Sequence, residues 1–224
     1  MQLSSLEKRI RSLELRGNKR PVLQVHEVET IPPVGIAATM RTAQEYEYQV
    51  NVVPLRLAGR IQVFRASAVV RSTVTDDTVA AFGLAVYKYN PTSYDSDDPV
   101  SAGQPYVLRR VAVLGVHTHS EGAEVDTQVP SRFNADLTKE VVLDPRSGVF
   151  FVAYTANEYG RWFCPGHGVG DPARRKGRKT SHIGTSVSDF PETLTVTAKS
   201  ADVPWVALRS TLGVRIYGDV ANYG

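Results

Sequence analysis

Apolar and polar residues alternate along most of the chain after residue 21, and such alternation is typical of strands with one buried face. The pattern predicts strands at residues 22–29, 45–53, 59–74, 79–90, 105–119, 138–144, 148–157, 192–200 and 212–220. Only a short polar turn at 75–77 separates 59–74 from 79–90, so we expect these two to pair as a long antiparallel hairpin. About eight to ten strands with long connections predict an all-β fold, a jelly-roll-like antiparallel β-sandwich.

Three stretches without strand periodicity interrupt this pattern, and we expect them to be loops at residues 91–104, 121–136 and 160–191. Loops longer than about 12–15 residues are uncommon in compact domains unless they bind something. A strong turn signal at residues 145–148, Pro-Arg-Ser-Gly, joins the strands on either side. Residues 21–224 are therefore expected to form one β-sandwich domain with three long loops.

Residues 1–20 have a helical pattern instead. Their apolar positions are spaced by three, four and three residues, as at the a and d positions of a coiled coil: Leu3, Leu6, Ile10 and Leu13. Gly17 and Pro21 end the pattern after about two heptads, and a helix this short is marginal in water on its own. We expect an amphipathic helix that serves as an oligomerisation or attachment arm.

Arg9 and Glu14 indicate how such helices could associate. With Leu3 at position a, Arg9 falls at g and Glu14 at e, which is the pair that links neighbouring helices in a parallel coiled coil. Parallel self-association as a trimer is the favoured interpretation. The alternatives are a helix folded back onto its own β domain and a helix docked into a groove on another protein. Because so short a zipper needs chains that are already held together, we also expect the β domain to be oligomeric.

Composition and charge narrow the classes of function. The 224 residues contain no apolar run long enough to cross a bilayer, so no membrane insertion is expected. The net charge is +3, and the basic residues gather at 9–20 and 174–179 without interleaved aromatics, which argues for solvated segments and against nucleic-acid binding. Cys164 is the only cysteine, so no intramolecular disulfide can form, and its bulky neighbours favour a buried thiol. No catalytic, phosphate-binding or dinucleotide-binding motif is present, so neither an enzyme nor a cofactor is predicted.

The histidines provide a partial metal pattern. His117 and His119 fall on one face of an expected strand, and Glu124 and His167 complete a possible set of three histidines and one carboxylate. The HTHSEGAE segment resembles the first motif of the cupin family, a jelly-roll group, which implies a metal-dependent enzyme as an alternative function. The motif differs in its glycines: only one residue separates Gly115 from His117, and Ser131 stands where the family has glycine. We therefore predict no metal site, with these four residues as the candidates if one exists.

Residues 60–157 carry a further resemblance. The strands RIQVFRASAVV and VAAFGLAVYKYN, followed by VVLDPRSGVFFVAY, resemble the jelly-roll modules of bacteriophage virion proteins of the baseplate, tail-fibre and head-fibre types. This resemblance implies a non-enzymatic, trimeric assembly protein located in the virion, with other virion proteins as partners. It also implies that the long loops contact neighbours or a host surface glycan. Aromatics in or beside these loops are candidates for stacking on sugars or anchoring an interface, and the equally favoured alternative is that they cover the edges of the sandwich: Tyr94, Tyr106, Tyr159 and Trp162. A carbohydrate-binding or receptor-binding module is the alternative function.

Overall fold

The structure is a computed structural model that describes residues 25–30, 38–41, 46–72, 79–90, 106–120, 131–165 and 177–212. These residues form 12 strands and one short 3-10 turn, with no α-helix among them. The expected helix at 1–20 lies outside the described residues. The strands are β1 (Val25–Glu29), β2 (Ala38–Arg41), β3 (Gln49–Leu55), β4 (Ile61–Ser72), β5 (Val79–Tyr89), β6 (Tyr106–Ser120), β7 (Ser131–Leu143), β8 (Val149–Ala156), β9 (Gly160–Pro165), β10 (Gly177–Ile183), β11 (Thr193–Ala201) and β12 (Val206–Leu212).

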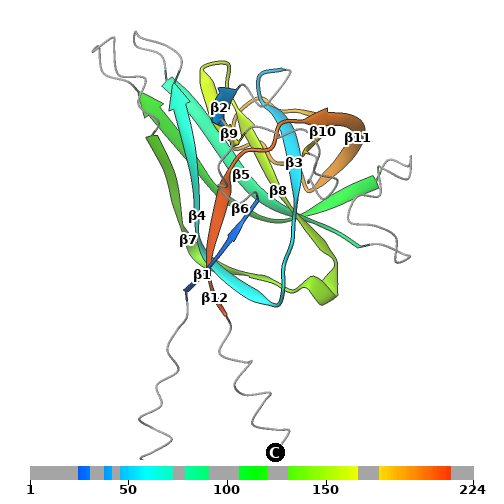
Figure 1. Cartoon of the computed structure of the whole chain (residues 1–224). Coiled ribbons are helices and arrows are strands. Elements are labelled where there is room, and N and C mark those ends of the chain that lie inside the picture. Colours follow the sequence, from blue (N-terminus) through cyan, green and yellow to red (C-terminus); the bar gives the residue numbers. More distant parts are fainter. Residues whose placement is uncertain are drawn as a thin grey trace, which may run out of the picture.

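Six of these strands close into a barrel in the order β10-β11-β6-β5-β8-β3 (Figure 1). All its pairings are antiparallel, and the pairing of β3 with β10 closes the ring. Barrel closure leaves few free strand edges on this layer. Among the described residues, β6 keeps a free edge, because β11 pairs with it at residues 106–109 whereas β5 pairs with it as far as Ser120.

The other six strands form an open antiparallel sheet around β4. One edge of β4 pairs with β12 at residues 61–68 and then with β9 at residues 70–72. The opposite edge pairs with β7. β1 extends the sheet beyond β12, and β2 extends it beyond β9.

The barrel wall made by β3, β5 and β8 is buried on both faces. In β8, Phe150, Val152 and Tyr154 belong to the core between barrel and sheet, while Phe151 and Ala153 belong to the core inside the barrel. Successive residues of a strand point to opposite faces, so a run without polar interruptions fills two cores at once. The molecule is therefore an antiparallel β-sandwich in which one layer is also a filled barrel.

A tight turn carries the chain from the open sheet into the barrel wall. The 3-10 turn Pro145–Ser147 begins after Asp144, whose side chain accepts a hydrogen bond from the backbone N–H of Arg146 at 2.9 Å. Gly148 follows with φ 143°, and a Cβ atom there would lie 2.4 Å from the carbonyl oxygen of Tyr89. Glycine is required at this position for both reasons. The turn signal at 145–148 is confirmed, and its flanking strands β7 and β8 lie in different layers.

The prediction of an all-β antiparallel sandwich is confirmed, but three local predictions are wrong. The expected hairpin of 59–74 with 79–90 does not form, because β4 lies in the open sheet and β5 in the barrel. The expected loop 121–136 includes the start of β7 at Ser131, and the expected loop 160–191 includes β9 and β10. β10 and the start of β7 are polar, and β9 is only six residues long, so none of them has a clear strand pattern in the sequence.

Candidate functional site

The two ends of the described chain lie side by side. β1 and β12 are antiparallel with Val25 opposite Thr211, and Leu212 is opposite Ile61 at the start of β4. We call this end of the body the terminal pole. The predicted arm residues lie outside the described residues: Leu3, Leu6, Arg9, Ile10, Leu13 and Glu14. Since they precede β1, an arm built from them joins the body at the terminal pole.

The opposite end, which we call the loop pole, is where β4 and β6 end and β5 and β7 begin (Figure 1). Val79 is opposite Ser120 there, and Ser131 is opposite Val70. Asn157, only 7% exposed, fixes this end: its amide nitrogen donates to the carbonyl of Val79 at 2.7 Å, and its side-chain oxygen accepts from the N–H of Ala81 at 3.0 Å. The candidate histidines lie on the adjoining part of β6.

His117 and His119 lie on the same face of β6, as expected. They are opposite Phe82 and Ala80 of β5, both of which belong to the core between barrel and sheet. The two imidazole rings are 6.4 Å apart and nearly parallel, with 14° between their planes.

The ring of His117 belongs to an aromatic cluster. Its centroid is 5.5 Å from that of Phe133 and 6.4 Å from that of Phe82, and both phenylalanines also contact Trp162. The Nε2 atom is buried without a hydrogen-bond partner. Burial and the neighbouring His119 both lower the pKa of His117 below its ordinary value. The neutral imidazole is thus favoured, and the half-buried ring packs against the aromatic side chains of the core.

Only two of the four metal candidates, His117 and His119, lie among the described residues. No group of three or more His, Cys, Asp or Glu side chains that could hold a metal occurs there. Glu124 and His167 lie outside the described residues, so the complete ligand set remains a hypothesis. The structure shows a histidine pair packed on aromatic rings and does not show a preformed chelate.

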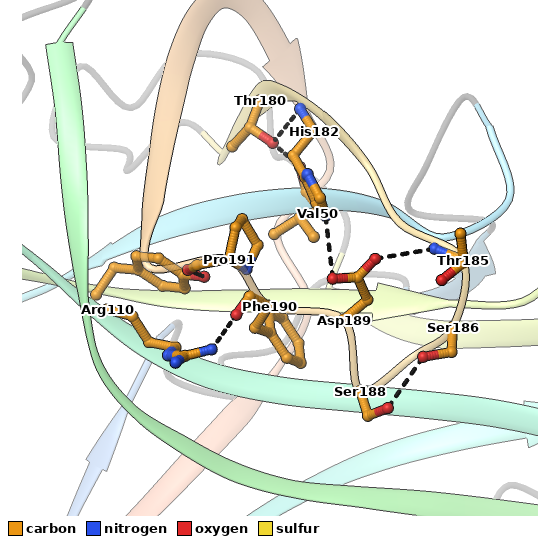
Figure 2. A network of polar contacts seen from close by, with 11 residues as sticks. Val50, Arg110, Thr180, His182, Thr185, Ser186, Ser188, Asp189, Phe190 and Pro191 are labelled. Carbon is orange, nitrogen blue, oxygen red and sulfur yellow. Dashed lines mark hydrogen bonds and ion pairs between the residues drawn. The ribbon is translucent and has the colours of Figure 1, made fainter.

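Part of the expected loop 160–191 closes one end of the barrel. Residues 184–191, which we call the plug, follow β10 and place Phe190 in the barrel core at 2% exposure (Figure 2). Tyr87 donates its hydroxyl proton to the carbonyl of Pro191 at 2.6 Å, and the Arg110 guanidinium donates to the carbonyl of Phe190. The plug is therefore anchored by ring burial and by one side chain each of β5 and β6.

The outer half of the plug has its own polar network (Figure 2). Asp189 accepts a hydrogen bond from the N–H of Thr185 at 3.1 Å and lies 3.8 Å from Nε2 of His182. The hydroxyls of Ser186 and Ser188 bond to each other at 2.9 Å. These contacts hold the segment in a compact turn. Sequence reasoning missed it, although Gly184 and Pro191 mark its two ends.

Several single-residue expectations can be compared with the structure. Cys164 is 3% exposed in the core between barrel and sheet, so the buried thiol is confirmed.

Arg178 of the second basic block is 7% exposed and donates to the carbonyl of Ala198, so the prediction of a wholly solvated block is wrong. Among the expected loop aromatics, Tyr106 and Trp162 are buried in the two cores, Tyr159 is half-buried and Tyr94 lies outside the described residues.

The outer face of the open sheet carries a row of charges across four strands. Glu27, Arg209, Arg65 and Asp136 are successive cross-strand partners on β1, β12, β4 and β7. The Nε atom of Arg209 is 3.4 Å from a Glu27 carboxylate oxygen, and the Nε atom of Arg65 is 2.5 Å from Oδ1 of Asp136. We call these four residues the charge row. The Arg65–Asp136 pair raises the pKa of Arg65 and lowers that of Asp136.

No protein-family model, curated protein or solved structure matches this chain. Within the described residues there is also no helix long and apolar enough to span a bilayer.

Proposed function

We propose that this protein is a non-enzymatic structural component of a bacteriophage virion. In this proposal it assembles as a trimer and connects or carries a tail, baseplate or fibre component. Its partners are copies of itself and other virion proteins, which the N-terminal arm contacts. The proposal needs no cofactor.

The pairing of β1 with β12 is the observation that carries this proposal. With Val25 opposite Thr211, the helical pattern at 1–20 precedes a strand that begins at one end of an all-β body. At the other end β4 and β6 finish and β5 and β7 begin. An arm that joins the body at one pole suits a protein that is anchored at that end. Contacts between the β bodies beside the terminal pole would hold three chains together, and this supplies the proximity that the short zipper needs.

The native mass of the full chain tests the trimer. We expect a mass that is a multiple of three chains of 24.6 kDa each. Replacing two d-position leucines in L6E/L13E should remove this factor of three, because carboxylates would be buried in the seam. The matched control S5E/S12E adds the same charge at position c of each heptad and should leave it intact. A mass without a factor of three in the unmodified chain contradicts the proposal.

Location in the virion needs a separate test. Peptides of this chain should be found by mass spectrometry in particles purified through a density gradient, in a fixed ratio to the major structural protein. Their absence from washed particles contradicts the proposal.

The cupin-like alternative has its own test: elemental analysis of the purified protein would have to find a stoichiometric transition metal that is lost in His117→Ala.

A glycan-binding role is a second candidate, and one turn at the loop pole favours it. Tyr46 is 54% exposed, and Tyr48 beside it adopts a left-handed conformation with φ 55°. Such a conformation is rare for a bulky residue, and two backbone hydrogen bonds hold it, to Ala156 and from Gly184. Binding of the full chain to an array of immobilised polysaccharides, lost in Tyr46→Ala and retained in Val107→Ala, would support this role. An array without any binding would exclude it for the polysaccharides displayed.

A further inference from the structure

β7 leaves one edge unpaired among the described residues. It pairs with β4 along one side, from Ser131 opposite Val70 to Leu143 opposite Ile61, and no described strand pairs with its other side. In Figure 1 this strand lies at the left margin of the molecule. The unpaired N–H and C=O groups of such an edge can accept another strand.

The pairable part of this edge is short and has a defined register. Between Val63 and Arg65 of β4 there is one residue, whereas the matching interval of β7, between Val141 and Asp136, holds residues 137–140. This bulge ends the regular strand, so only residues 131–136 present a straight edge. Within them Arg132, Asn134 and Asp136 are exposed on the outer face, and Phe133 points into the core.

The exposed residues of this stretch are complementary to themselves. When two copies are placed antiparallel with Asn134 opposite Asn134, Arg132 of each copy falls opposite Asp136 of the other. The Arg132 side chain has no hydrogen-bond or ion-pair partner among the described residues. Asp136 is 71% exposed and uses Oδ1 for Arg65, which leaves Oδ2 for a second guanidinium.

We propose that residues 131–136 pair with the same residues of a second copy of this chain, antiparallel about Asn134. A two-fold axis normal to the sheet then joins two open sheets into one continuous sheet, with outer face matching outer face. The charge row of each copy extends by one residue, from Asp136 to Arg132 of the second copy. Charge complementarity selects this register over its neighbours, because a shift by one residue places Arg132 opposite Ala135.

This contact goes beyond the proposed function, because it uses β7 and not the N-terminal arm. The arm accounts for a factor of three in the native mass, and β7 accounts for a factor of two. The assembly formed by the unmodified chain should therefore contain six copies. The assembly of L6E/L13E should contain two copies, and that of the β7 variant R132D should contain three. The two proposals can fail separately: a trimer alone overturns the β7 contact, and a dimer alone overturns the arm.

A charge exchange tests the register. R132D places two carboxylates opposite each other and should weaken the two-fold association about tenfold or more. The Arg132 side chain has no described partner within its own chain, so the variant is expected to fold. R65D/D136R reverses the pair within one chain and also places two guanidiniums opposite each other across the contact, with the same loss.

Mixing R132D with R65D/D136R should restore the contact between two β7 strands. In a mixed pair each position 132 faces an opposite charge at position 136, so the factor of two should return only in the mixture. The control R146D changes an exposed arginine on the 3-10 turn and should keep the two-fold association of the unmodified chain. Retention of the factor of two in R132D alone, or failure of the mixture to recover it, overturns the proposal.

Discussion

Substituting Gly83 by alanine tests whether the plug is seated as the structure shows. Gly83 lies on the barrel-facing side of β5, between Val116 of β6 and Thr155 of β8. A Cβ atom there would lie 1.9 Å from the carbonyl oxygen of Val187 and 3.0 Å from the ring of Phe190. β5 is hydrogen-bonded on both sides and cannot move away, so the plug must be displaced.

The expected loss of stability follows from the groups that become exposed to water when the plug is displaced. Phe190 is 2% exposed, and returning a buried phenylalanine side chain to water costs about 1.5–3 kcal/mol. The hydrogen bond from the Tyr87 hydroxyl to Pro191 is lost as well and is worth about 1 kcal/mol. We expect Gly83→Ala to lower the free energy of unfolding by about 3 kcal/mol, which for a chain of this size corresponds to about 6–12 °C in Tm.

Urea unfolding at equilibrium, with hydrogen exchange of the amides at 184–191, is the appropriate assay. Gly59→Ala is the matched control, because a Cβ atom there meets nothing within 4 Å and the variant should change stability by less than about 1 kcal/mol. In a Phe190→Ala background the effect of Gly83→Ala should shrink, since both changes remove the same burial. Equal stabilities of Gly83→Ala and Gly59→Ala, with unchanged exchange at the plug, would refute the reasoning.

Three further predictions concern single side chains. Burial raises the pKa of Tyr87 above its ordinary value of 10.0, so stability should fall as the pH rises above about 10, and Tyr87→Phe should flatten this decline in urea titrations at pH 8 to 11. Burial lowers the pKa of His117, so the unfolded state binds the proton more readily and the free energy of unfolding should fall as the pH drops below about 6.5. His117→Phe should reduce that loss. An unchanged dependence of stability on pH in this variant would contradict the assignment. Cys164, 3% exposed, should react with a thiol reagent far more slowly in the native protein than in urea, and equal rates would show that the core around it opens easily.

Strands with one or two strongly apolar faces could be predicted from the sequence. Residues 79–90 and 148–157 match β5 and β8 to within a residue or two at each end, because their apolar runs are long. Strand partners could not be predicted in the same way. A short turn favours a hairpin locally, but burying the shared wall on both faces required β4 and β5 to separate into different layers.

Short or polar strands were the ones missed. β10 reads GRKTSHI and belongs to the barrel because its backbone closes the ring and Arg178 and Thr180 are buried with hydrogen-bond partners. Neither residue has a hydrophobic signal. The histidine pair was found on the correct face of its strand, but its packing against Phe133 depends on β7, which is distant in sequence and was predicted only in part.

The wall shared by the two cores has a consequence for how the body unfolds. A sandwich of two separate sheets can lose one layer while the other persists, but β3, β5 and β8 contribute side chains to both cores. Removing the open sheet would expose one face of the wall, and opening the barrel would expose the other. The two cores should therefore melt in one cooperative transition, with the slowest amide exchange of the whole chain in these three strands.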